Sequence, residues 1–390
     1  MSDDFARGRA FGPAKARNVT QYRKPGIDRS VRSAAVSSYD KVKDLPLEID
    51  GYELQGLDFE VPDAFERLTT IIHLKGGGHE GLGEDVVYDA LDHVAFQDAG
   101  PVLDLAGKHT IASFSELLDG LPLFPSPPER EVSVNYRRWA FESAALDLAL
   151  RQADKSLHEV VGREPKPVTF VVSMRLTPPG SEEVSTIEPV RERLEIYPAL
   201  RFKLDPTNDW TDELIGQLVE TGAVDSLDLK GQYKGTPVDV ETDPVLYRKL
   251  IDAFPDAWLE DPDVSDETRP ILDPVADRVT WDAVIHSVDD IKAQPWMPKM
   301  VNIKPSRFGP LHELFAGYDF CDENGIGAYG GGQWELGPGR GHIQYLASIF
   351  HPDTPNDVAP SGYNTAGTEP GLPSSPLEPM PTPTGFRWGE

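Results

Sequence analysis

The chain has 390 residues, of which 39% are hydrophobic and 26% are charged, a composition typical of a folded globular protein. Its formal net charge of −28 argues against nucleic acid or an anionic membrane as the partner of the whole protein. No run of residues approaches the roughly 20 consecutive apolar residues that a membrane-spanning helix requires.

The N-terminal residues lack the apolar stretch and small-residue cleavage site of a secretory signal. One cysteine, Cys321, excludes an internal disulfide framework and fits a reducing compartment. We therefore expect a cytoplasmic protein.

Residues 1–44 are predicted to form a basic, flexible arm that packs on another subunit or on the acidic body. Most of its cationic residues lie among Gly, Pro, Ser and Ala, namely Arg7, Arg9, Lys15, Arg17, Arg23, Lys24, Arg29 and Arg32. No recognisable nucleic-acid-binding motif accompanies this charge, so nucleic acid is not the expected partner.

Residues 45–160 alternate between strand-like and helix-like segments. Residues 68–74 form a short segment rich in β-branched side chains, which predicts a strand. The glycine-rich residues 76–85 predict a loop, and they lack the lysine and serine spacing of a phosphate-binding loop. Apolar residues at helical spacing predict one long helix from Tyr136 to Val161.

From residue 161 to 352 short apolar strands alternate with helices, a pattern that predicts parallel strands covered by helices. The predicted strands are 169–176, 200–204, 226–229, 257–259, 279–281, 300–303 and 325–329, and two of the predicted helices are 243–254 and 310–324. Seven or eight such units in about 190 residues favour a closed (β/α) barrel over an open sheet. The Pro-, Gly- and Ser-rich residues 353–390 are expected to pack back on the N-terminal region.

Charged residues recur where the predicted strands end, which is the active-site face of a barrel. Three successive strands end with Asp228, Glu260 and Asp282, and lysines follow or end the strands on either side, at Lys203 and Lys304. Three carboxylates can hold one magnesium ion, which stabilises an oxyanion as it forms. A lysine near such an ion has a lowered pKa and can remove a proton.

These residues resemble the enolase superfamily, nearest to its muconate cycloisomerase and o-succinylbenzoate synthase branch, over about residues 50–390. The carboxylates are 32 and 22 residues apart and Lys304 follows 22 residues later. The most specific short matches are residues 259–262, Leu-Glu-Asp-Pro, and residues 301–304, Val-Asn-Ile-Lys. Residues 141–149 resemble the helix that leads from the capping domain of this family into its barrel.

The resemblance implies a modified TIM barrel with an α+β capping domain over residues 45–160. It implies magnesium binding by Asp228, Glu260 and Asp282, with Lys304 and Lys203 as the catalytic acid/base residues. A proton α to a substrate carboxylate would be removed through an enediolate, leading to cycloisomerisation, epimerisation or elimination. Residues expected to contact a small carboxylate substrate are Lys230, Arg201, Glu335 and Asn302. We also expect a homo-oligomer.

Strand two permits two registers. In the first, Lys203 is the base and Arg201 replaces the first lysine of a pair that the family often carries. In the second, Lys203 is the supporting lysine and Asp205 stands at the base position, which disfavours racemisation by two bases.

Three other functions stay open. Residues 321–332 are similar to strand seven of methylaspartate ammonia-lyase, but the short interval from Glu260 to Asp282 and the missing strand-two histidine depart from that enzyme. A non-catalytic barrel that serves as a binding module is another, although it has no need for this charged set. The third is a phosphate-binding barrel enzyme, but this chain lacks a glycine-rich turn next to a helix start in its late strands, apart from residues 330–332.

Overall fold

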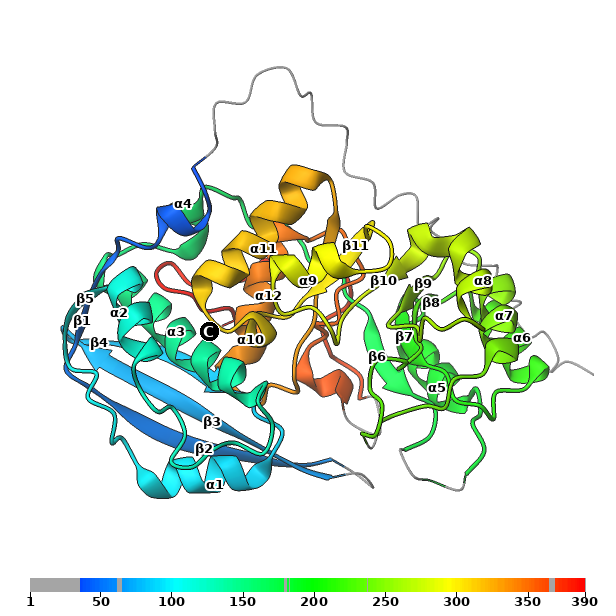
Figure 1. The fold of residues 1–390 in the computed structure, drawn as a ribbon, viewed down its shortest axis with the longest axis horizontal. Coiled ribbons are helices and arrows are strands. Elements are labelled where there is room, and N and C mark those ends of the chain that lie inside the picture. Colours follow the sequence, from blue (N-terminus) through cyan, green and yellow to red (C-terminus); the bar gives the residue numbers. More distant parts are fainter. Residues whose placement is uncertain are drawn as a thin grey trace, which may run out of the picture.

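The computed structural model describes residues 36–61, 65–178, 181, 183–236, 238–364 and 369–389. Residues 1–35 of the predicted basic arm lie outside this range. An α+β region forms the N-terminal part, and parallel strands with helices around them form most of the remainder (Figure 1). Among the described residues, no helix is long and apolar enough to cross a membrane.

The N-terminal region packs antiparallel strands against helices. Its elements are β1 Pro46–Ile49, β2 Gly51–Val61, β3 Phe65–Gly76, β4 His79–Asp85, α1 Ala90–Ala99, β5 Gly107–Thr110, α2 Ile111–Asp119 and α3 Ser133–Gln152. Strands β2, β3 and β4 form a meander, and β1 pairs with β5. Helix α3 is buried along most of its length, and it makes its most extensive packing against β4.

The predicted loop over residues 76–85 is wrong, because most of this segment is strand β4. Only the turn at Gly77 and Gly78, both with positive φ, separates it from β3. The glycines serve close packing instead of flexibility. A Cβ on Gly81 would lie 2.1 Å from the carbonyl oxygen of Ala144, and one on Gly83 would lie 1.9 Å from that of Ala140. The strand therefore lies directly on the backbone of α3, where only glycine fits.

The single long helix predicted to end at Val161 is also divided. Helix α3 ends at Gln152, and a short helix, α4 Leu157–Val161, follows a turn that contains Asp154 with φ 55°. The side chains of Ser156 and Glu159 form a capping box that begins α4. The helical spacing of the apolar residues continues across the break, which is why the pattern did not reveal it.

Parallel strands and covering helices make up the rest of the described chain. The strands are β6 Val172–Arg175, β7 Phe202–Asp205, β8 Val224–Asp228, β9 Trp258–Glu260, β10 Val279–Thr280, β11 Met300–Ile303 and β12 Gly327–Gly330. The helices are α5 Glu188–Ile196, α6 Asp212–Thr221, α7 Pro244–Ala253, α8 Arg269–Leu272, α9 Val288–Ala293, α10 Pro305–Phe308, α11 Leu311–Asn324 and α12 Pro338–Phe350. The predicted alternation of strands and helices is confirmed.

The strands form one five-stranded parallel sheet in the order β10-β9-β8-β7-β6 and one two-stranded sheet, β11-β12. Backbone hydrogen bonds link the edges of these sheets to each other and to residues 356–357. They run from Asn302 N to Trp281 O at 2.9 Å, from Asp357 N to Gly330 O at 2.8 Å, and from Val171 N to Asn356 O at 2.9 Å. The carboxyl ends of all seven strands therefore face the same side.

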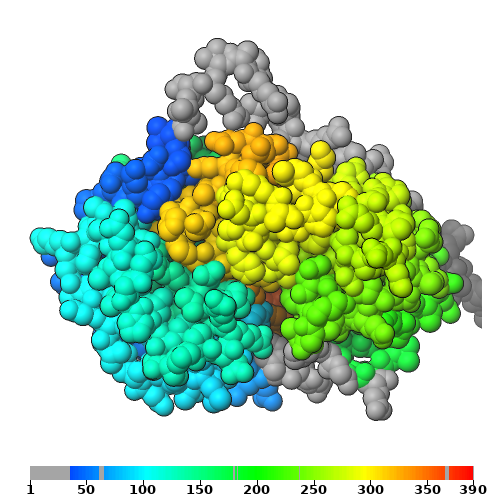
Figure 2. All heavy atoms as spheres, in the orientation of Figure 1, coloured from blue at the N-terminus to red at the C-terminus, as the bar shows by residue number. Residues whose placement is uncertain are grey.

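The C-terminal segment returns to the N-terminal region, so that the C mark lies beside α3 in Figure 1. The buried carboxylate of Asp147 on α3 accepts a hydrogen bond from Phe386 N at 2.8 Å and one from Arg387 Nε at 2.7 Å. In Figure 2 the N-terminal and parallel-strand regions lie side by side, with the latest residues visible only in the seam between them.

Candidate metal centre and active site

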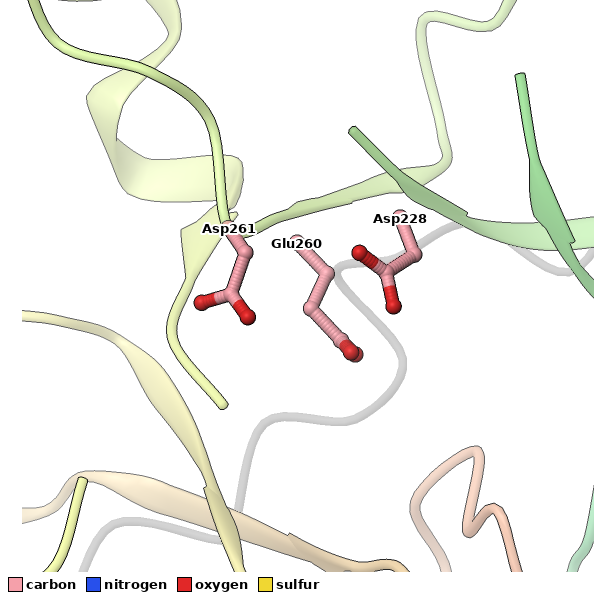
Figure 3. A group of neighbouring side chains, drawn as sticks. All are labelled: Asp228, Glu260 and Asp261. Atoms are coloured by element: carbon pink, nitrogen blue, oxygen red, sulfur yellow. The ribbon is translucent and has the colours of Figure 1, made fainter. Parts of the chain in front are cut away.

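Three carboxylates lie in a row at the carboxyl ends of three neighbouring strands. Asp228 ends β8, Glu260 ends β9, and Asp282 lies two residues after the end of β10. Asp228 and Glu260 are direct partners in the β8–β9 register, and all three residues are 0–1% exposed. Figure 3 shows the carboxylates of Asp228 and Glu260 turned toward one space. Because buried like charges repel, such a row requires cations close by.

Lys203 enters this row from β7. It pairs with Ser226, two residues before Asp228, so it lies deeper in the sheet than the strand ends. Its Nζ contacts Glu260 Oε1, Asp228 Oδ2 at 3.3 Å and Asp357 Oδ2 at 3.5 Å. Burial opposes the charged form, but these carboxylates outweigh it and raise the pKa of Lys203 well above the usual lysine value. Lys203 therefore acts as a buried counter-ion of the row.

An ion pair between Asp205 and Lys230 closes the Asp228 end of the row. Lys230 follows the end of β8 with a left-handed backbone, φ 54°. Its Nζ lies 2.5 Å from Asp228 Oδ2 and 3.2 Å from Asp205 Oδ2. Asp205 ends β7, and burial raises its pKa even though Lys230 favours the ionised carboxylate.

Two cations and a tyrosine hold the other end of the row, at Asp282. Lys304, which follows β11 directly, places its Nζ 2.9 Å from Asp282 Oδ2. Arg307 in α10 places Nη1 3.1 Å from Asp282 Oδ1, and the hydroxyl of Tyr233 donates to Oδ2 at 3.0 Å. Burial opposes ionisation, but Arg307 and Lys304 outweigh it and lower the pKa of Asp282.

Asp261 is a fourth carboxylate near the row. One oxygen from each of Asp228, Glu260 and Asp261 lies within 4.8 Å of the other two, as Figure 3 illustrates. However, Asp261 Oδ1 accepts a hydrogen bond from Asp282 N and Oδ2 accepts one from Ala283 N, both at 2.8 Å. Burial and the nearby Asp282 and Asp228 raise the pKa of Asp261 to about 7.

Carboxylate groups outnumber cationic groups in this cluster by two. Within the described residues it contains six carboxylates and four cations, namely Asp205, Asp228, Glu260, Asp261, Asp282 and Asp357 against Lys203, Lys230, Lys304 and Arg307. Burial raises the pKa of Glu260 well above its usual value, against the effect of Lys203 and with that of Asp228 and Asp282. A buried set of carboxylate oxygens with two more acidic groups than cationic groups fits one hard divalent cation such as magnesium.

Asn302, predicted from sequence to contact the substrate, lies beside Lys304. Asn302 in β11 is buried, and neither atom of its amide has a hydrogen-bond partner among the described residues. A Cβ on Gly331 would lie 2.6 Å from Lys304 Cε and 2.9 Å from Asn302 Nδ2, which places Asn302 beside the catalytic candidate Lys304. Asn302 can thus offer both a donor and an acceptor to a ligand.

Glu335 and Arg201 have different surroundings. Glu335 lies in the loop after β12, where it accepts a hydrogen bond from Gln333 N at 2.6 Å and pairs with Arg340 at 3.2 Å. Arg201 precedes β7 and pairs with Asp225, near the amino end of β8. The structure therefore does not bring Arg201 to the carboxylate row.

Five polar residues of the cluster were not predicted from sequence: Asp261, Asp357, Arg307, Tyr233 and Tyr329. The hydroxyl of Tyr329, on β12, donates to Glu260 Oε2. Arg307 follows Lys304 by three residues, a spacing that brings it round the first turn of α10 and that a motif search could have used. Asp357 gave no signal, because the Pro-rich residues around it do not have the pattern of a strand.

Two family profiles match the chain. The N-terminal domain of the family described as domain of unknown function DUF8230 matches residues 40–160, and its C-terminal domain matches residues 164–365. The boundary between the two matches lies at the end of helix α4, before the first parallel strand, β6.

Curated relatives and solved structures are also similar to the chain. An o-succinylbenzoate synthase from Geobacillus stearothermophilus is 26% identical over 236 residues, 59% of this chain and 60% of the relative, so the chain spans about 60% of that relative's length. A solved structure of an enolase superfamily member from Enterococcus faecalis is similar with TM-score 0.57 and 18% identity, covering 80% of this chain and 86% of the other. A dipeptide epimerase from Methylococcus capsulatus, complexed with magnesium, has TM-score 0.60 and 19% identity, covering 80% and 89%.

Proposed function

The chain belongs to the family described as DUF8230, with both of its domains present, and we propose that it is a magnesium-dependent enzyme of the enolase superfamily. It would remove a proton α to a substrate carboxylate through an enediolate. The observation that carries this proposal is the row of Asp228, Glu260 and Asp282, buried at neighbouring strand ends within a cluster in which carboxylates outnumber cations by two.

We propose Asp228, Glu260 and Asp282 as the residues that would hold the ion, since each is a buried carboxylate at or just after the end of one of three neighbouring strands. A magnesium ion bound there would supply positive charge that lowers the energy of an enediolate oxyanion. The Lys203 ammonium contacts the same carboxylates that such an ion would bind. We therefore expect this ammonium to shift away from Glu260 when the ion binds.

Lys304 is proposed as the acid/base residue. It follows β11 directly, is 7% exposed and is held by Asp282, so its Nζ lies beside the row rather than in solvent. A carboxylate substrate whose α carbon lies next to this amine would transfer its proton to Lys304 Nζ. Asn302, two residues before Lys304, is proposed to bind a polar group of the same substrate.

For strand two we propose the second of the two registers. Lys203 lies deep in the sheet among carboxylates, and Asp205 ends the strand in an ion pair with Lys230. This leaves one unambiguous amine base, Lys304, and gives Lys230 the role of a cation facing the substrate. Elimination or cycloisomerisation, which one base can complete, is then favoured over epimerisation.

We also propose that the two parallel sheets are parts of one closed barrel. Residues 356–357 would be the eighth strand, since their backbone bonds to β12 on one side and to residues 169–171 on the other. The cluster contact between Lys203 and Asp357 supports this placement, because it joins strand two to the eighth position.

The test combines ion binding with proton exchange. Calorimetric titration of the full chain with magnesium should give one bound ion, and Glu260→Gln should abolish it. Incubation in deuterated water with a panel of acid sugars, dipeptides and lactones should give α-deuteration that stops on chelation. Lys304→Ala should remove the exchange, whereas the exposed control Lys299→Ala should keep it. Exchange retained by Lys304→Ala would exclude Lys304 as the base.

A further inference from the structure

Asp261 occupies an unusual position next to Glu260. Adjacent residues of a strand point to opposite faces of the sheet. Asp261, however, has φ 48°, a left-handed conformation that is uncommon for a residue with a side chain. The turn places its carboxylate on the same side as those of Glu260 and Asp228, as Figure 3 shows. By proximity alone, Asp261 would count as a metal ligand in place of Asp282.

The hydrogen bonds of Asp261 argue for another role. Its two carboxylate oxygens accept from the backbone N–H groups of Asp282 and Ala283, one each. Asp261 is 0% exposed, so no solvent can replace these acceptors. If its oxygens turned toward a cation, two buried N–H groups would lose their partners, which is unfavourable. The two backbone hydrogen bonds therefore restrain the Asp261 carboxylate from turning toward an ion.

The backbone of Asp261 also joins three strand ends. Its N–H donates to Thr280 O in β10 at 3.0 Å, and its carbonyl accepts from Gly231 N, after β8, at 2.8 Å. A Cβ on Gly231 would lie 2.1 Å from Asp263 N, so the loops after β8 and β9 pack in direct backbone contact. Asp261 thus connects the ends of the three strands that hold Asp228, Glu260 and Asp282.

We propose that Asp261 is a positioning residue that fixes Asp282, and that it does not ligate the metal. This inference rests on the proposed function for the role of Asp282. Asp261 holds the backbone of Asp282, and Lys304 and Arg307 hold its carboxylate, so the side chain is restrained at both ends. Glu260 and Asp261, although adjacent in sequence, then have different roles: Glu260 binds the metal, and Asp261 positions Asp282.

The test uses backbone amide exchange, which does not require a substrate. Hydrogen–deuterium exchange of a peptide covering residues 280–285 should be about tenfold faster in Asp261→Asn, equivalent to about 1.4 kcal/mol. Asp263→Asn is the matched control, since that carboxylate lies two residues away and is partly exposed beside Lys234. It should leave this exchange unchanged.

Addition of magnesium separates the two roles of Asp261. A positioning residue keeps its hydrogen bonds, so magnesium should not accelerate exchange at Asp282 and Ala283 in the unaltered chain. In calorimetry, Asp261→Asn should bind one ion about 10–100-fold more weakly, as expected for an outer-shell change. Faster exchange on magnesium addition, or unchanged exchange in Asp261→Asn, would overturn the inference. If the unaltered chain binds no magnesium, the proposed function fails, and the metal-free exchange comparison still decides the role of Asp261.

Discussion

His342 offers a sharp test of how the C-terminal segment packs on the rest of the chain. It lies in α12 and is fully buried, and neither ring nitrogen has a hydrogen-bond partner among the described residues. Its imidazole stacks on Phe386, with ring centroids 4.4 Å apart and planes 9° from parallel. Burial lowers the pKa of His342 from 6.5 to about 4.

The sign and size of the effect follow from proton linkage. Because the pKa is lower in the folded chain, the unfolded chain binds the proton first as the pH falls below 6.5. The contribution of His342 to stability is therefore complete above that pH and is lost progressively toward pH 4. The linkage relation gives a loss of about 2 kcal/mol between pH 7 and pH 5, and about 3 kcal/mol by pH 4.

Denaturant unfolding of the unaltered chain and of His342→Leu at pH 7, 6 and 5 measures this contribution. The difference between the two unfolding free energies should shift by about 2 kcal/mol in favour of His342→Leu on acidification, since leucine does not titrate. His79→Leu, at an exposed histidine of β4, should show no such shift. Parallel pH profiles for the unaltered chain and His342→Leu would refute the reasoning.

Two further changes test contacts of strand β4, one with the start of helix α12 and one with the backbone of α3. Glu84→Ala should lower the melting temperature and cost about 2 kcal/mol, because the buried carboxylate accepts N–H groups at the start of α12; an unchanged melting temperature would contradict this. Gly83→Ala should cost about 3 kcal/mol or more in denaturant unfolding, since a Cβ there meets a backbone carbonyl of α3. Gly51→Ala, with open space around its Cβ, is the control, and equal losses would argue against the close contact.

The parallel strands could be predicted because their sequences are buried on both faces. Residues 300–303 were placed correctly to the residue, and the carboxylates Asp228 and Glu260 end their strands as the pattern indicated. Fully apolar runs bounded by turn residues have few alternative readings. The residue after such a run then falls at the strand end without further information.

Other features depend on tertiary contacts that no local pattern records. Glycines in residues 76–85 predicted a loop because glycine favours turns, whereas here they permit contact between β4 and the backbone of α3. The register of β7 could not be chosen from Arg201, Lys203 and Asp205 alone, since the partners that identify each side chain come from other strands. Asp357 lies in a Pro-rich segment whose pairing is supplied entirely by its neighbours.

The return of residues 385–387 to α3 has a consequence for how the protein is made. Asp147 receives Phe386 N and Arg387 Nε from positions 239 and 240 residues further along the chain. During synthesis on a ribosome, the N-terminal region emerges long before residues 386 and 387 are made. Asp147 therefore cannot form these two hydrogen bonds until synthesis is nearly complete. Contacts so distant in sequence form late in folding. A nascent chain that stalls before residue 385 would therefore expose an incompletely paired Asp147, a defect that quality-control proteases can recognise.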